Sequence, residues 1–399
     1  MASHRVRTRE GPILVLDPIA RHTVAAVRGL GMAGWDVVVA GFDRPSDAIA
    51  SRSRYARRPY ERLPDPHGPA APFGAALAEV VRRRGCQAVV AVSDSTIAQL
   101  RGLSPDLAAV PRLDASLDRI IDKVDLASSC ATAGVAYPTT WLADDRAPAS
   151  APWPRIVKPR RTAMVRSRGV VGRTGAFVVE NAVQEAAAIA ALRAEDLEPM
   201  VQVRVDRTRA VSVAIVRHRR QTTVRLAYRV LLEYPPRGGQ AAAIVAIDPH
   251  EGIGARAIAA AERVCDAAGF EGLANAQLYV QPDGSPCLIE INPRVYGSMW
   301  FPERLGLRVM DRAVLAALGE APSPAIEYRP GRRFHRPVLE AQWLLAPGAD
   351  RGPAGALPAI VRPWDVFDLV SVRDPLPLAA GLRHLLRRAG SEMVRRRTA

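Results

Sequence analysis

The sequence is poor in the residues that mark several common kinds of site. Its four cysteines form no C-x-x-C pair, so neither a zinc site nor a disulfide framework is indicated. Its seven histidines include no H-E-x-x-H motif, and no G-x-S-x-G motif of a hydrolase is found. No apolar run approaches the roughly 18 residues that cross a bilayer, and no apolar region follows the charged N-terminus. We therefore expect a cytoplasmic protein without a membrane span.

Aromatic residues are also scarce, at 5% of the chain, although the net charge is +15. The arginines are not interleaved with several aromatics, which argues against a stacking platform for single-stranded nucleic acid. Nucleic acid is therefore not an expected partner. The basic C-terminal segment, residues 383–399, leaves one alternative open: a short amphipathic helix that meets anionic lipid or RNA.

Lysine is almost absent: of 55 lysines and arginines, only Lys123 and Lys158 are lysines. Either cation serves on an ordinary surface, so a position that keeps lysine indicates a need for an ammonium group. An ammonium is a compact point charge, whereas a guanidinium is a planar fork. Lysine is a common partner of phosphate oxygens. The alternative is that two lysines survived by chance. It becomes less attractive if other parts of the chain also support a phosphate site.

That support lies at residues 286–298, which read PCLIEINPRVYGS. Residues 287–291 are typical of a β-strand interrupted by one carboxylate, Glu290. In a strand Glu290 and Asn292 point to the same face, because side chains alternate with period two. Carboxylate and amide oxygens suit a hard cation such as Mg²⁺.

A second predicted strand, residues 272–280, carries Gln277, and the PDGS turn that follows it predicts a hairpin. We therefore expect Gln277, Glu290, Asn292 and Arg294 to converge on one face of an antiparallel pair. The alternative is a buried polar cluster at the end of a hairpin. In such a cluster Glu290 would be a buried carboxylate without a partner, which is energetically costly.

Together these residues resemble the ATP-grasp superfamily, and most of all its carbamoyl-phosphate-synthase-like, carboxylate–amine ligase type. That family carries a late E-x-N-x-R motif, here Glu290, Asn292 and Arg294, and a Glu or Gln on the neighbouring strand. It also carries two phosphate-facing cations, one after a D-K-like step and one in a V-K-P-like strand. The segments IDKVDLA and WPRIVKPR place Lys123 and Lys158 at these two positions.

The resemblance implies an α/β fold with a Rossmann-like pre-ATP-grasp domain followed by a two-subdomain ATP-grasp α+β domain. We expect the first domain at 1–115, the second at 116–320 with its small subdomain at about 150–200, and a Pro- and Arg-rich extension with a terminal helix at 321–399. Alternating strands and helices in the first part of the chain agree with a parallel sheet. The G-x-G-x-x-G at residues 29–34 closes a predicted helix rather than opening one, so it is not a dinucleotide fingerprint.

The resemblance also implies roles for particular residues. Lys158 and Arg294 would act in catalysis, and Gln277, Glu290 and Asn292 would hold Mg²⁺, for which Mn²⁺ could substitute. The ATP-binding residues would be Lys123, Lys158, Ser167, Arg168, Gly169, Gln202, Val203 and Val205. The sequence departs from the family where Val203 replaces a usual Glu in the hinge strand, and where Thr162, Ala163 and Met164 replace expected glycines.

The implied activity is an ATP-dependent carboxylate–amine ligase that forms an acyl phosphate and releases ADP and phosphate. Its partners would be a small-molecule carboxylate and an amine, and a homodimer is left open. One alternative is another ATP-grasp reaction, phosphorylation of a small acid or carboxylation. Another is a non-catalytic ATP-binding regulatory protein, which the departures at the hinge suggest. We expect substrate specificity to lie in the N-terminal domain and in the 229–240 loop.

Overall fold

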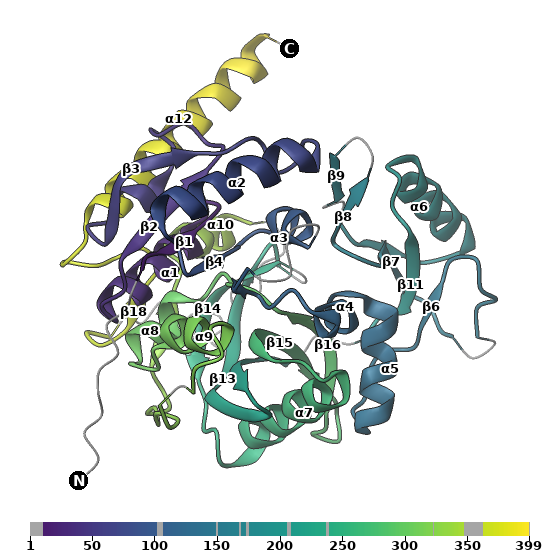
Figure 1. Ribbon diagram of the computed structural model, residues 1–399. Coiled ribbons are helices and arrows are strands. Elements are labelled where there is room, and N and C mark those ends of the chain that lie inside the picture. The colour runs from purple at the N-terminus through teal and green to yellow at the C-terminus, as the bar shows by residue number, and fades with distance from the viewer. Residues whose placement is uncertain are drawn as a thin grey trace.

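The computed structural model describes residues 11–101, 107–148, 151–166, 169–172, 175–205, 209–236, 239–321, 323–346 and 362–398. Within these ranges the chain forms a five-stranded sheet, a four-stranded sheet, a seven-stranded sheet and a two-stranded hairpin (Figure 1). The first sheet is parallel and carries helices, and the others are largely antiparallel, which confirms the predicted α/β class.

The five-stranded sheet has the order β3-β2-β1-β4-β5. Its strands are β1 (Ile13–Val15), β2 (Val37–Gly41), β3 (Ala56–Arg62), β4 (Ala88–Val90) and β5 (Ala109–Val110). Its helices are α1 (Arg21–Met32), η1 (Ile49–Arg52), α2 (Ala70–Arg84) and α3 (Asp94–Leu100). The strand order reverses between β1 and β4, and open α/β sheets bind ligands beyond the carboxyl ends of the strands at such a point. Helix α3 begins at this edge.

Two helices, α4 (Ala115–Ile121) and α5 (Lys123–Ala133), lead to the four-stranded sheet, whose order is β10-β7-β11-β6. Its strands are β6 (Thr140–Leu142), β7 (Arg155–Pro159), β10 (Phe177–Val179) and β11 (Pro199–Val203), and helix α6 (Ala182–Ala194) covers it. Between β7 and β10 the chain forms the hairpin β8 (Ala163–Arg166) and β9 (Gly169–Gly172).

The seven-stranded sheet has the order β16-β15-β12-β13-β14-β17-β18. Its strands are β12 (Ala210–His218), β13 (Gln221–Tyr234), β14 (Gln240–Ala246), β15 (Gly272–Val280), β16 (Pro286–Asn292), β17 (Arg333–His335) and β18 (Val366–Phe367). The remaining helices are α7 (Gly252–Ala268), α8 (Trp300–Arg304), α9 (Val309–Ala317), α10 (Pro337–Leu345) and α12 (Leu376–Thr398).

The two faces of this sheet have different neighbours. Val211, Val213 and Ile215 of β12 face a core shared with α5 and α7. Ala214 and Val216 of the same strand face a core shared with α8, α9, α1 and the first sheet. This alternation is the period of two that a strand buried on both faces requires. One apolar core therefore joins the first sheet to the large sheet.

The C-terminal segment returns to the first helix. The guanidinium of Arg28 in α1 donates from Nε to the carboxylate of Asp374 at 2.9 Å, and both side chains are 1% exposed. Arg28 also stacks over the Trp300 ring, 4.9 Å from its centroid. Helix α12 then packs against η1 and continues beyond the first sheet, in yellow at the top of Figure 1.

Several elements differ from the sequence-based expectations. The segment in which Thr162, Ala163 and Met164 replace expected glycines leads into the hairpin β8–β9, and β13 extends to Tyr234 inside the segment expected to be a specificity loop. Strands β17 and β18 come from the Pro- and Arg-rich segment and join the large sheet. None of the helices described is both long and apolar enough to cross a membrane.

Candidate active site

Six of the predicted site residues line one cavity of about 180 Å³ between the four-stranded and seven-stranded sheets: Lys158, Gln202, Val203, Val205, Gln277 and Glu290. They come from β7, β11, β15, β16 and the segment after β11. The cavity is therefore lined by segments that lie far apart in the sequence. Glu233 of β13 and Tyr279 of β15 also line it, and neither was singled out from the sequence.

Lys158 is held in this cavity by an amide. Its Nζ donates to Gln202 Oε1 at 2.9 Å, and Gln202 Nε2 in turn donates to Thr140 Oγ1 at 2.9 Å. The N–H of Val203 donates to the carbonyl oxygen of Thr139 at 2.9 Å. The side chain of Gln202 therefore orients the ammonium of Lys158, and the Val203 N–H is already engaged by the protein.

The hairpin β15–β16 places the predicted metal ligands together. Gln277 lies opposite Glu290, and Asn275 lies opposite Asn292, as the antiparallel pairing predicts. The register shifts directly after Gln277, so Ile289 is an extra residue on β16, a β-bulge. Three oxygen-bearing side chains, those of Gln277, Glu290 and Asn292, thus share one face.

This donor set fits a hard cation in kind, because all three side chains offer oxygen. It contains a single carboxylate, Glu290. No cluster of three or more His, Cys, Asp or Glu side chains within the described ranges could hold a metal ion. An ion bound at Gln277, Glu290 and Asn292 would therefore depend on the amide oxygens and on the phosphates that accompany it.

A second cavity adjoins the first. It is lined by Asp94, Arg101, Lys123, Thr162, Glu290 and Asn292, together with apolar side chains of α3, α4 and α5. Glu290 lines both cavities, so Lys158 in one and Lys123 in the other lie on two sides of the same carboxylate. The two lysines of the chain are thus brought to one composite site.

Lys123 is 7% exposed and begins helix α5. Its Nζ and its backbone N–H both donate to the carbonyl oxygen of Arg160 at 3.2 Å, and this is the one hydrogen bond of the ammonium group in the described part of the chain. Burial lowers the pKa of Lys123, and the nearby carboxylates of Glu290, Asp94 and Asp122 oppose that shift. An ammonium has three N–H donors, so two remain for an anion.

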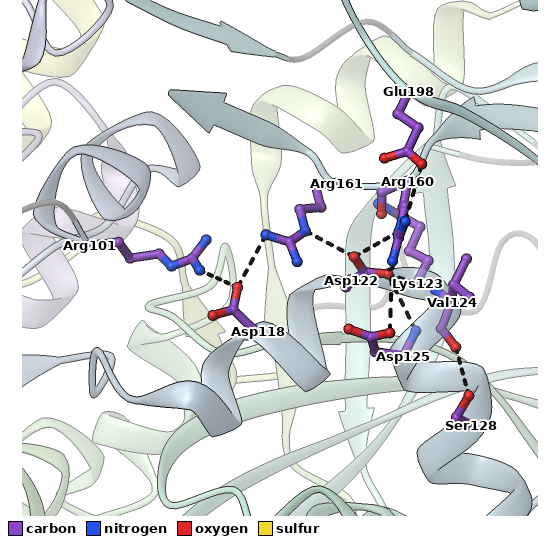
Figure 2. A network of polar contacts seen from close by, with 10 residues as sticks. All are labelled: Arg101, Asp118, Asp122, Lys123, Val124, Asp125, Ser128, Arg160, Arg161 and Glu198. Atoms are coloured by element: carbon purple, nitrogen blue, oxygen red, sulfur yellow. Dashed lines mark hydrogen bonds and ion pairs between the residues drawn. The ribbon is translucent and has the colours of Figure 1, made fainter. Parts of the chain in front are cut away.

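A buried carboxylate, Asp122, fixes the surroundings of Lys123 (Figure 2). It caps α5 by accepting from the N–H of Val124 at 3.0 Å, and it accepts from Arg160 Nε and Arg161 Nε, each at 2.9 Å. Burial alone would raise the pKa of Asp122, but the bonds from the two guanidinium groups lower it overall. Because Arg160 follows Lys158 by two residues, this carboxylate ties α5 to the strand of the second lysine.

The same network reaches the first sheet. Arg161 Nη1 lies 3.2 Å from Asp118 of α4, and Asp118 also pairs with Arg101 at the end of α3 (Figure 2). Ion pairs among arginine and aspartate side chains therefore connect helices α3 and α4 with the segment that follows β7.

Arg294, the last residue of the E-x-N-x-R motif, is paired across the structure. Its Nε donates to Asp94 Oδ1 at 2.7 Å and its Nη2 to Asp94 Oδ2 at 3.2 Å. Asp94 follows the parallel strand β4, a place from which it could either cap α3 or line a cleft. The structure gives the cap to Ser93, whose side chain accepts from the N–H of Thr96, and places Asp94 in the cavity wall. The position of Asp94 after a parallel strand was the signal available beforehand.

Of the predicted ATP-binding residues, Ser167 and Arg168 lie outside the part of the chain that the structure describes. Gly169 lines neither cavity: it has a φ of 130°, and a Cβ there would lie 2.2 Å from the carbonyl oxygen of His67. The next residue, Val170, donates its N–H to that same oxygen at 3.1 Å. The hairpin β8–β9 is thus docked on residues 67–68 of the N-terminal part.

No family model matches the sequence, and a search of curated proteins finds no match to it. Solved structures do match in fold. An L-amino acid ligase from Bacillus licheniformis superimposes with a TM-score of 0.62 at 15% identity, over 82% of this chain and 79% of that one. N5-carboxyaminoimidazole synthetase from Staphylococcus aureus superimposes with a TM-score of 0.61 at 16% identity, over 80% of this chain and 81% of that one. Biotin carboxylase from Campylobacter jejuni superimposes with a TM-score of 0.61 at 14% identity, over 82% of this chain and 75% of that one. At these identities the likeness establishes the fold, which is that of ATP-grasp proteins.

Proposed function

We propose that this chain, which has the ATP-grasp fold, is an ATP-dependent ligase that joins a small-molecule carboxylate to an amine. One observation carries the proposal: Glu290 lines both cavities, with Lys158 in one and Lys123 in the other. Phosphoryl transfer needs positioned charge more than a covalent protein group, and this arrangement supplies cations on two sides of a carboxylate.

The reaction proceeds in two steps. An oxygen of the substrate carboxylate attacks the γ-phosphorus of ATP, the bond to the β-phosphate oxygen breaks, and ADP leaves. The amine then attacks the acyl carbon, phosphate leaves, and the amine nitrogen loses a proton. The product is an amide, with ADP and phosphate.

The residues have distinct tasks in these steps. Lys158 and Lys123 bind phosphate oxygens as compact cations, and the burial of Lys123 strengthens its interaction. Arg294 stabilises the negative charge on the transferring phosphoryl group. Gln277, Glu290 and Asn292 are the residues that would hold the Mg²⁺ of Mg-ATP, and this ion would supply positive charge that offsets the charge of the phosphates.

A second candidate function is carboxylation, with bicarbonate as the acid. It is favoured by the likeness in fold to a biotin carboxylase and to an N5-carboxyaminoimidazole synthetase. The likeness to an L-amino acid ligase favours amide formation to a similar degree. The composite site supports activation of a carboxylate in either case, so the choice of acid separates the two reactions.

The test is a screen of amino acids, dipeptides and bicarbonate, in pairs with amines, for phosphate release from Mg-ATP. A ligase releases phosphate only when the acid and the amine are both present, and its nucleotide product is ADP. Hydroxylamine in place of the amine should trap a hydroxamate from an acyl phosphate. AMP as the main product would contradict the mechanism. Binding of Mg-ATP without turnover for any pair would instead indicate a regulatory ATP-binding protein.

A further inference from the structure

The guanidinium of Arg294 meets the carboxylate of Asp94, a residue that lines the second cavity, in a side-on pair, although 200 residues separate them. We propose that Asp94 is a positioning residue: it orients Arg294 so that the free edge of the guanidinium faces the transferring phosphoryl group. The inference rests on the proposed function, and it assigns to the N-terminal part of the chain a role in the chemical step.

Two N–H groups of this guanidinium have no partner among the residues that the structure describes. A guanidinium carries five N–H groups. Asp94 takes the one on Nε and one on Nη2, and the carbonyl oxygen of Val295 takes one on Nη1 at 3.2 Å. The two that remain, one on Nη1 and one on Nη2, are the donors that Arg294 can offer to the oxygens of an anion. Two partners on different sides of the group prevent its rotation.

Asp94 is itself held firmly. The turn before α3 is fixed by Asp17, which accepts from the N–H of Val92 at 2.9 Å and from the N–H of Ser93 at 2.7 Å. The far end of α3 is fixed by the pair of Arg101 with Asp118. The helix is thus anchored at both ends, and its face with residues 94, 97, 98 and 101 lines the cavity.

A purely stabilising role does not account for the pair. The side chains of Arg294 and Asp94 are 21% and 31% exposed, and ion pairs that reach solvent contribute little to stability. A direct substrate contact by Asp94 is the other possibility. It predicts a higher KM for acid or amine, whereas positioning predicts a lower kcat with the KM for ATP unchanged.

The experiment is a double-mutant cycle with Asp94→Asn and Arg294→Gln, because a residue that acts only through another adds no loss once that other is gone. Asp94→Asn should lower kcat about tenfold or more. In the Arg294→Gln background the same change should have almost no further effect. Asp144→Asn, in an ion pair on the far side of the four-stranded sheet with side chains 48% and 87% exposed, is the matched control and should behave as wild type.

A second measurement needs no turnover. Aluminium fluoride beside Mg-ADP imitates the transferring phosphoryl group, so it should tighten ADP binding to the wild type and to Asp144→Asn but not to Asp94→Asn or Arg294→Gln. Tightening that survives in Asp94→Asn, an equal loss in both backgrounds of the cycle, or a change confined to KM for acid or amine would overturn the positioning role. If the wild type binds Mg-ADP but gains nothing from the fluoride, the proposed function itself fails.

Discussion

The ammonium of Lys123 donates to the backbone carbonyl oxygen of Arg160 at 3.2 Å, and so the first residue of α5 is joined to the end of the strand that carries Lys158. The N-terminus of a helix and the C-terminal end of a strand are thereby held together. The proposed function gives a reason for lysine at both places: a small cation with three donors can bond an oxygen of the protein and still reach phosphate.

The first prediction concerns Lys158. Lys158→Ala should abolish detectable Mg-ATP binding, and Lys158→Arg should also bind poorly, because a planar fork cannot keep the bond to Gln202 and reach the same phosphate oxygens. Isothermal titration with Mg-ATP measures both. Arg193→Ala, in an exposed ion pair of the same region, is the control and should bind normally. Wild-type affinity in both Lys158 variants would move the phosphate site elsewhere.

The second prediction concerns Glu290, the carboxylate shared by both cavities. Glu290→Ala should reduce turnover by several orders of magnitude, since each loss of about 1.4 kcal/mol of transition-state stabilisation is tenfold in rate. Magnesium titrations of turnover in the wild type, in Glu290→Ala and in Glu290→Gln give the comparison, with circular dichroism as a check of folding. An unchanged magnesium dependence in these variants would show that the metal is bound by other residues.

The third prediction concerns Glu303, whose carboxyl group lies against Gly29 of α1 and accepts from the N–H of Met310 at 2.8 Å. Burial raises its pKa from 4.5 to about 7. The folded protein therefore holds a proton there that the unfolded chain releases, so this contribution to stability is full below pH 4.5 and is lost as the pH rises to about 7. The loss should be about 3 kcal/mol.

Urea unfolding of the wild type and of Glu303→Gln at pH 5 and pH 8 tests this. The glutamine variant lacks the titrating group, so its stability relative to the wild type should rise between the two pH values. Glu251→Gln, at an exposed position, should follow the wild type. Parallel pH profiles for Glu303→Gln and the wild type would show that Glu303 is not the group responsible.

The fourth prediction concerns the buried pair of Arg28 and Asp374. Asp374→Ala leaves an uncompensated guanidinium in the core and should destabilise the protein by about 3–5 kcal/mol. Asp36→Ala removes a pair with Arg57 whose side chains are 51% and 56% exposed, and should cost less than about 1 kcal/mol. Denaturant unfolding of both variants and of the wild type measures the two losses of stability. Equal small effects would mean that Arg28 finds another partner when Asp374 is lost.

The fifth prediction concerns the docking of the hairpin β8–β9. Gly169→Ala should detach it from residues 67–68, because the backbone φ of 130° and the contact at 2.2 Å with the His67 oxygen both exclude a Cβ. Limited proteolysis should cut the variant faster in the hairpin. Gly175→Ala, where a Cβ would meet nothing within 4 Å, is the control. Identical cleavage rates would show that the hairpin is held by other contacts.

Residue patterns predicted those parts of the fold that depend on local signals. Alternating strands and helices indicated the parallel first sheet, and strand alternation with a predicted turn placed Gln277 opposite Glu290. The bulge at Ile289 was not predictable, since it depends on how β16 pairs with β15. The partners of Arg294 and Lys123 were missed because Asp94 and Arg160 carry no local pattern that reports a contact across the fold. Strands β17 and β18 have two or three residues, too short for any periodicity to show.

The pairing of Arg28 with Asp374 has a consequence for biosynthesis. At about 5–20 residues per second, a ribosome needs roughly 20 to 70 s to add the residues between these two positions. Throughout that time the guanidinium of α1 lacks its carboxylate, and Trp300, which stacks on it, is itself made late. The helix that covers the N-terminal sheet is thus made long before residue 374, and its buried guanidinium gains its partner only after that residue has been added.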